Sequence, residues 1–119
     1  MTTPADLRRV ALGFPEAYED VHRKRPAFRV QKRIFAMLGV TGNAALFADL
    51  ANADVAVVKL DRDDQLNMVE ALPGVQPTGD YGHHGWTYLR LPELDEAGLA
   101  LVLRLAWTHV APKRLSKAR

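Results

Sequence analysis

The sequence predicts an α+β fold: a two-layer sandwich with a largely antiparallel sheet and helices packed on one face. Three observations support this prediction. Four β-rich segments are grouped along the chain, and apolar residues at helical spacing occur before, between and after them. The 119 residues, 48% hydrophobic and 25% charged, have the size and balance of one ordinary globular domain. We therefore expect a single domain over residues 1–112 and a basic C-terminal tail over residues 113–119.

The first helix is expected close to the N-terminus. Thr3 is a suitable N-cap, Pro4 suits the first helical position, and Asp6 lies three residues after the cap. The apolar residues that follow are spaced as on one helix face: Leu7, Val10, Ala11 and Phe14. Gly13 then ends the helix.

Four segments read as strands. Residues 27–30 alternate between apolar and other positions, and residues 34–38 are continuously apolar. The short polar break at 31–33 predicts that these two form an antiparallel hairpin. Residues 55–60 are rich in β-branched side chains, and residues 86–91 form the fourth predicted strand.

Two more helices are predicted. One begins after Asp61 as N-cap, ends at Pro73 and carries an apolar stripe of Leu66, Val69 and Leu72. The other runs from about residue 94 to 111, and its buried face should contain Leu94, Leu101, Val102, Leu105, Ala106 and Val110. Four aromatic residues are assigned to the core: Phe28, Phe35, Phe47 and Trp107. Residues 41–53 fit a short helix or an extended excursion, and residues 75–85 are expected to form a loop.

The charge is segregated along the chain. The formal net charge is only +2, from 16 Lys and Arg against 14 Asp and Glu, so long-range attraction to a polyanion is modest. Residues 22–33 and 113–119 contain basic residues and no acid, whereas acids gather at 16–20 and 49–70. A two-stranded ribbon fits the major groove of DNA, and basic residues near its turn would meet phosphates. The residues predicted to contact nucleic acid are Lys24, Arg25, Lys32, Arg33, Lys113 and Arg114. The alternative is a solvated hairpin whose charges prevent aggregation.

Other candidate sites are weaker. His83 and His84, near Asp80 and Tyr81, suggest a metal or acid–base site, but a solvated Gly-rich loop explains them better. Trp86 and Tyr88 lie on one strand face, where they either stack on exposed bases or, as we prefer, pack under a helix. The acids at positions 61, 63 and 64 are explained by helix capping. With no cysteine and no catalytic or phosphate-binding motif, no metal, cofactor or catalytic residue is predicted.

Three stretches carry a resemblance to a known family: residues 25–36 (RPAFRVQKRIFA), 58–61 (VKLD) and 81–86 (YGHHGW). Together they resemble the MmcQ/YjbR family. That resemblance implies a fold similar to the bacterial frataxin homologue, with a "double wing" surface that binds DNA. Some members carry a Lys and a His just ahead of the tryptophan, where this sequence has His83 and Gly85, and segment 44–53 is longer here than in the shortest relatives.

The leading functional hypothesis is therefore a non-enzymatic module that binds DNA. One alternative is a protein-interaction or adaptor domain that presents the same basic surface to an acidic partner. Another is a frataxin-like metal carrier, although the first helix lacks the acidic ridge that this would require. The sequence shows no secretory signal pattern and no apolar run long enough to span a membrane, so a cytoplasmic protein without a membrane partner is expected.

Overall fold

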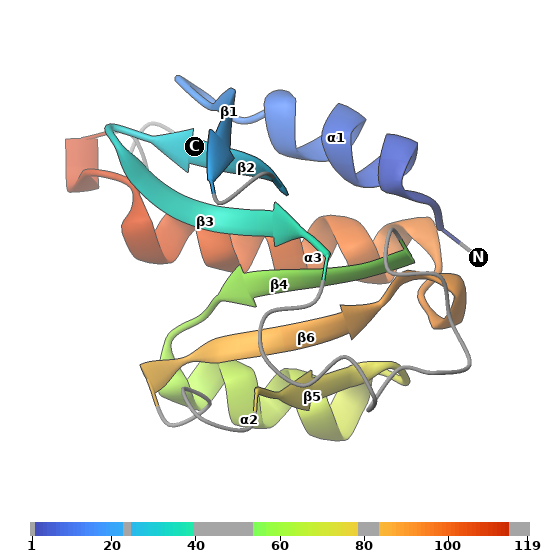
Figure 1. Ribbon diagram of the computed structural model, residues 1–119. Coiled ribbons are helices and arrows are strands. Elements are labelled where there is room, and N and C mark those ends of the chain that lie inside the picture. The colour runs from blue at the N-terminus through green and yellow to red at the C-terminus, as the bar shows by residue number, and fades with distance from the viewer. Residues whose placement is uncertain (1, 23–24, 40–53, 79–83, 115–119) are drawn as a thin grey trace.

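The computed structural model describes residues 2–22, 25–39, 54–78 and 84–114. Within these ranges, six strands form one antiparallel sheet in the order β1-β2-β3-β4-β6-β5 (Figure 1). The strands are β1 (Tyr18–His22), β2 (Arg25–Val30), β3 (Arg33–Leu38), β4 (Val55–Lys59), β5 (Val75–Pro77) and β6 (Trp86–Arg90). Helices α1 (Pro4–Leu12), α2 (Arg62–Ala71) and α3 (Glu96–Val110) pack on one face of the sheet, as the sequence predicted. No helix of the described ranges is long and apolar enough to cross a membrane.

The predicted caps of α1 and α2 are confirmed. The Thr3 hydroxyl accepts a hydrogen bond from the Asp6 N–H (3.2 Å), and the Asp6 carboxylate accepts one from the Thr3 N–H (2.9 Å). This reciprocal capping box satisfies two of the backbone donors that a helix start leaves unpaired. Asp61 caps α2 in a similar way, through the N–H of Asp63. Helix α3 begins at Glu96, close to the predicted start at about residue 94; Asp95 is its N-cap, and the short 3-10 helix Leu91–Glu93 precedes it.

The main core lies between the helices and the sheet. It contains Phe28, Phe35 and Trp107, all of which are fully buried, as predicted. Phe14 extends this aromatic group, since its ring stacks on Trp107 at 5.7 Å and meets Phe35 edge-on at 6.3 Å. Phe47 lies outside the described residues, as does the ambiguous segment 41–53.

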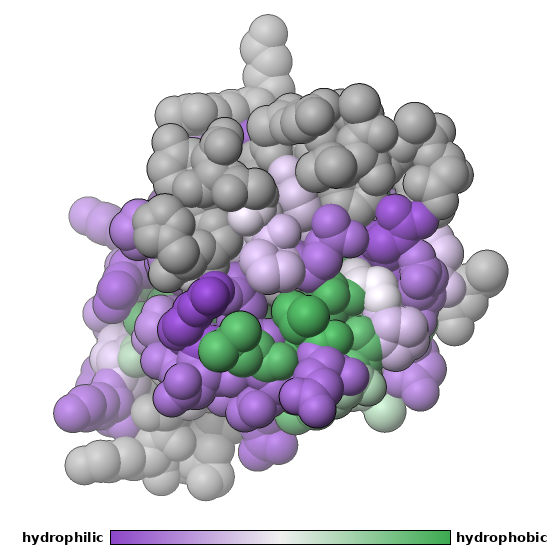
Figure 2. Space-filling view, turned by 90° about the horizontal axis from the view of Figure 1, so that it is seen from below, coloured by the Kyte–Doolittle hydropathy of each residue, from purple (hydrophilic) through white to green (hydrophobic). Residues whose placement is uncertain are grey.

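The predicted apolar stripe of α2 is correct only for Leu72, which packs against the core, and is wrong for Leu66 and Val69. Leu66 is 51% exposed and Val69 is 36% exposed, and Figure 2 shows an apolar patch on this side of the molecule, the lower side of Figure 1 where α2 lies. The helix instead buries Gln65 completely, with Met68 and Leu72 packed against the core. The Gln65 amide donates to the Trp86 carbonyl (3.1 Å) and the Thr87 hydroxyl (3.0 Å). These hydrogen bonds satisfy a buried polar side chain and so set the rotation of the helix.

The predicted buried face of α3 is largely correct, with one exception. Leu94, Val102, Ala106 and Val110 are buried, and Leu105 is partly buried. Leu101 is 43% exposed instead. The helix turns so that Leu99, Leu103 and Trp107 face the sheet, which leaves Leu101 beside α1 at the surface.

The two outermost strands, β1 and β5, were not predicted. β1 carries four exposed residues in a row and therefore lacks the apolar alternation that identifies a half-buried strand. β5 has three residues and ends at Pro77, in a segment that the sequence predicted as loop. Short, charged or proline-containing edges are typical of sheets that resist pairing with other chains. The hairpin of β2 and β3 is antiparallel as predicted, with an irregularity in register between Phe28 and Arg29.

Candidate nucleic-acid interface

The β2–β3 hairpin closes through a tight two-residue turn. Val30 and Arg33 are direct partners in the strand ladder, so only Gln31 and Lys32 connect the strands. Both have positive φ, +48° and +70°, which is the backbone geometry of a type I′ turn. Asn and Gly are the residues that favour this turn, and a left-handed conformation costs other L-residues roughly 1–2 kcal/mol each. Such a turn persists only because neighbouring groups hold it.

Two side chains hold the backbone of Lys32. Its N–H donates to the Tyr18 hydroxyl (3.1 Å), and its carbonyl accepts from Nη1 of Arg29 (2.7 Å). Arg29 is itself positioned by Asp20, whose Oδ2 lies 3.4 Å from Nε without hydrogen-bond geometry. The Lys32 side chain remains exposed. The turn therefore presents this ammonium group from a fixed backbone.

Three cations gather at the end of the sheet that contains this turn. Lys32 and Arg33 are exposed, and neither forms an ion pair with a carboxylate of the described residues. Lys59 is the last residue of β4, which runs antiparallel to β3 and so ends near the start of that strand. Burial and the nearby positive charge of Arg33 both lower the pKa of Lys59. We call Lys32, Arg33 and Lys59 the basic end.

Lys59 also contacts an aromatic ring. It is the direct partner of Trp86 in the β4–β6 ladder, and its Nζ lies 5.3 Å from the centre of the Trp86 ring. The same Nζ donates a hydrogen bond to the His84 carbonyl. This contact combines a cation–π interaction with a fixed hydrogen bond, and so it holds the ammonium group and the ring against one another.

Trp86 lies on the sheet face opposite the helices. It is half-buried and packs against a small cluster formed by Val55, Val57 and Tyr88, whereas the alternate β4 residues Ala56 and Val58 belong to the helix-covered core. Tyr88 is buried, as we preferred, but neither aromatic residue packs under a helix. The predicted pair therefore divides into a buried tyrosine and a tryptophan with exposed surface.

The C-terminal basic residues lie near the same turn. Nη1 of Arg114 lies 3.1 Å from a carboxylate oxygen of Glu16, two residues before the Tyr18 that binds Lys32. Figure 1 shows the end of α3 and the β2–β3 turn at the same end of the molecule. Lys113 is exposed. Arg25 is half-buried at the start of β2, and Lys24 lies outside the described residues.

The acidic segment 16–20 does not form a separate acidic surface. Each of its three carboxylates pairs with an arginine from another element: Glu16 with Arg114, Glu19 with Arg8, and Asp20 with Arg29. These pairs partly neutralise Arg29 and Arg114 as phosphate-binding groups. Lys32, Arg33 and Lys59 at the basic end have no such carboxylate partner among the described residues.

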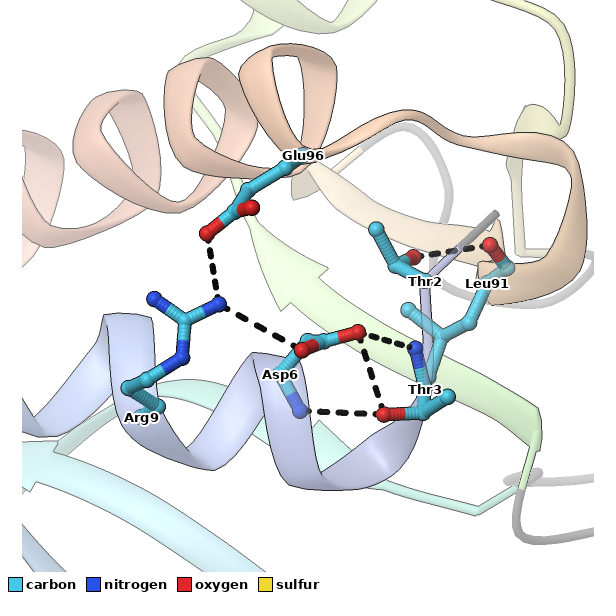
Figure 3. A network of polar contacts seen from close by, with 6 residues as sticks. All are labelled: Thr2, Thr3, Asp6, Arg9, Leu91 and Glu96. Carbon is cyan, nitrogen blue, oxygen red and sulfur yellow. Dashed lines mark hydrogen bonds and ion pairs between the residues drawn. The ribbon is translucent and has the colours of Figure 1, made fainter.

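A groove lies between α1 and α3, away from the basic end. This groove of about 590 Å³ is lined by Val10, Phe14, Ala100 and Leu101, with Arg9 and Arg104 at its edges. Arg9 bridges Asp6 and Glu96, which joins the starts of the two helices (Figure 3). Its charge is thus already neutralised, and its role is structural.

Histidines and carboxylates do not converge on a metal site in the described part of the chain, where no group of three could hold an ion. His84 is exposed, and its carbonyl is occupied by Lys59. His83, Asp80 and Tyr81 lie outside the described residues.

Sequence reasoning missed Lys59 and the supporting role of Tyr18. Both strands that bring Lys59 and Trp86 together were predicted, but the pairing between them was not, because no local signal specifies it. The turn geometry, in contrast, could have been predicted from the length of the hairpin loop. Strands ending at Val30 and starting at Arg33 leave a two-residue loop, which demands left-handed backbone at Gln31 and Lys32.

Comparisons with known proteins agree with this fold. The YjbR family model matches residues 12–109. The crystal structure of Deinococcus radiodurans protein DR2400, which contains a domain of the DUF419 family model, superposes with a TM-score of 0.70 at 20% sequence identity. That alignment covers 99% of this chain and 85% of DR2400, and at this identity it shows the fold alone. No curated protein matches the chain at a significant level.

Proposed function

The chain belongs to the YjbR family, and we propose that it is a non-enzymatic module that binds nucleic acid through the basic end. The observation that carries this proposal is the convergence of Lys32, Arg33 and Lys59 without a neutralising carboxylate among the described residues. Several arginines elsewhere on this surface are paired with carboxylates, namely Arg8, Arg9, Arg29, Arg90 and Arg114. Unpaired cations held on a rigid turn are suited to phosphate oxygens.

The geometry suits a backbone contact better than base recognition. Lys32 and Arg33 are long cationic side chains on a fixed turn, and Lys113 and Arg114 add positive charge beside it. Phosphate contacts position a protein on nucleic acid but carry no sequence information. We therefore propose weak DNA binding with little dependence on sequence, in the range of about 10⁻⁴–10⁻⁶ M at physiological salt. The resemblance to the MmcQ/YjbR family supports the same ligand.

A salt titration tests this proposal. The parent protein and the variant Lys32→Glu/Arg33→Glu are titrated onto several duplexes of unrelated sequence at a series of salt concentrations. For the parent, log affinity should fall linearly with log salt. The variant should bind all duplexes more weakly, and its slope should be smaller by about 0.9 for each phosphate that it no longer neutralises. Thermal melting should be nearly unchanged, because exposed charges contribute little to folding.

A matched control separates a local effect from net charge. Arg33→Glu and Arg104→Glu change the net charge equally, but Arg104 lies at the groove between α1 and α3. We expect only Arg33→Glu to flatten the salt dependence. Equal effects of the two variants would show non-specific attraction to the whole surface. Absence of DNA binding by the parent even at low salt would reject the proposal and leave an acidic protein partner as the better hypothesis for this surface.

A further inference from the structure

Exposed apolar side chains occur on both sides of α3 in the helix layer. On one side, the groove between α1 and α3 contains Leu101, which is 43% exposed. On the other side, the outer face of α2 carries Leu66 and Val69, which contribute to the apolar surface on the side shown in Figure 2. Figure 1 shows α3 lying between α1 and α2. Apolar surface that gathers in this way favours burial against another protein surface.

The walls of the groove are held in place by contacts within the chain. The Phe14 ring stacks on Trp107, and the indole N–H of Trp107 donates a hydrogen bond to the Pro15 carbonyl at 3.1 Å. Ala97 and Ala100 line the α3 side, and their small side chains leave the groove open. A fixed groove with small residues along one wall can accept a helix that presents larger apolar residues one turn apart.

The charges beside the two features are opposite in sign. Arg104 is exposed at the groove and forms no ion pair with a carboxylate of the described residues. Asp63 and Glu70 are exposed on α2, three residues before and four residues after Leu66, so all three lie on one helix face. Neither carboxylate forms an ion pair within the described ranges. The one cation of α2, Arg62, donates to the Gln65 side chain. Each feature thus combines apolar surface with a charge that complements the other.

We propose that the chain forms a dimer in which α2 of each copy lies in the groove between α1 and α3 of the other. Leu66 and Val69 are then buried beside Leu101, and Arg104 meets the two carboxylates of α2. Because the groove and α2 lie on opposite sides of α3, a two-fold axis parallel to α3 makes both contacts at once. Two-fold dimers are the commonest closed assemblies. The contact area is small, so the dimer is weak and depends on protein concentration.

Sedimentation equilibrium of the full chain tests the dimer without nucleic acid, so the result is independent of the proposed function. Protein concentration is varied from about 10 μM to about 1 mM, the range in which a weak contact is populated. The average mass should rise from 13.2 kDa toward twice that value. The mass of one chain at the highest concentration would overturn the dimer. Growth beyond two chains would overturn the closed arrangement.

Two substitutions test the apolar contact. Leu66→Glu and Leu101→Glu each place a carboxylate in both copies of the contact, and each should weaken the dimer by about 10-fold or more. Val21→Glu is the matched control, because Val21 is 68% exposed on the edge strand β1, outside the helix layer, and it should leave the dimer unchanged. Equal weakening by all three variants would overturn the proposed surface. Thermal melting of each variant verifies that it is folded.

A charge exchange tests the polar contact. Arg104→Glu should weaken the dimer by about 10-fold, because it faces like charges on α2 of the partner. Adding Asp63→Lys and Glu70→Lys to this variant should restore most of the association. A combined variant that is no more associated than Arg104→Glu alone would show that these groups do not meet.

Disulfide trapping tests which faces are in contact. The chain has no cysteine, so a cross-link can form only between introduced residues. Leu66→Cys and Leu101→Cys are mixed and oxidised, and the linked peptides are mapped. We expect a disulfide between position 66 of one copy and position 101 of the other, since this bond requires Cα atoms within about 7 Å. Leu66→Cys mixed with Val21→Cys is the control. Links only between identical positions, or a yield equal to that of the control, would overturn the reciprocal arrangement.

Discussion

Two charged regions of this protein are built in opposite ways. At the N-terminal junction, formed by Thr3, Asp6, Arg9 and Glu96, each charged group has a partner, and the contacts join α1 to α3 (Figure 3). At the basic end, Lys32, Arg33 and Lys59 have no carboxylate partner in the described ranges. Pairing, rather than the number of charges, therefore separates a contact that organises the fold from a surface available to a ligand. Substitutions in each region can test this distinction.

The largest effect is expected where the basic end joins the core. Gly85 has φ of +95°, and a Cβ at this position would lie 1.9 Å from the Leu60 carbonyl oxygen. Gly85→Ala should therefore push apart the segments that carry Lys59 and Trp86 and destabilise the protein by about 3 kcal/mol or more. Urea unfolding measures the loss. Gly13→Ala is the control, because Gly13 has negative φ and its Cβ would lie 3.3 Å from the nearest backbone oxygen, so the loss should be much smaller.

The turn at Lys32 should show stability and binding moving in opposite directions. Lys32→Gly removes the cost of a left-handed lysine and should stabilise the protein by about 1 kcal/mol, while it weakens DNA binding through loss of a charge. Gln31→Asn relaxes the same turn but keeps Lys32, so it should stabilise without weakening binding. Paired unfolding and binding titrations distinguish the two. A Lys32→Gly variant that is less stable than the parent would show that the lysine conformation is not strained.

A smaller effect is expected from removing the hydroxyl that holds this turn. Tyr18→Phe deletes the acceptor for the Lys32 N–H and changes no charge. The loss of one hydrogen bond at a partly exposed site should cost about 0.5–1 kcal/mol. Binding should weaken although every cation remains, because Lys32 is then less rigidly presented. Unchanged affinity in Tyr18→Phe would show that charge alone, without preorganisation, accounts for binding.

The features that the sequence predicted correctly are those specified by neighbouring residues. The capping box of Thr3 and Asp6 and the β2–β3 hairpin each depend on a few consecutive positions. The orientation of α2 was predicted wrongly for Leu66 and Val69 because Gln65 finds buried partners on β6, and tertiary hydrogen bonds override the apolar stripe. An amphipathic pattern therefore indicates a helix more reliably than it indicates which face is buried.

The candidate site was predicted in part for the same reason. The basic run up to Arg33 is visible along the chain, and the structure places Lys32 and Arg33 at an exposed turn. The contact of Lys59 with Trp86 depends on strand register across a long stretch of sequence. The neutralisation of Arg29 and Arg114 by Asp20 and Glu16 likewise depends on how distant segments pack together. Charge counted along the sequence thus overstates the charge that a ligand can meet.

The smallest effect concerns the N-terminal junction and its response to pH. Hydrogen bonds from Thr3 lower the pKa of Asp6 below its ordinary value of 3.8, and Arg9 contributes further. A carboxylate whose pKa is lowered in the folded state stabilises the protein above its unfolded pKa, and this contribution disappears as the pH falls through the folded value. Asp6→Asn should therefore be less stable than the parent at neutral pH, and the difference should close only under acid conditions below about pH 3.8.

Thermal melting of both proteins from neutral to strongly acidic pH measures this closure. Arg9→Met provides the matched control, because Thr3 contributes more than Arg9 to the lowered pKa of Asp6. In the Arg9→Met background, the loss of stability caused by Asp6→Asn should therefore keep most of its dependence on pH. Neither variant should alter nucleic-acid binding, since the junction lies between α1 and α3 and its charges are paired. A binding defect in Asp6→Asn with unchanged melting would contradict the separation of the two regions, because it would place a ligand contact within the charges assigned to the fold.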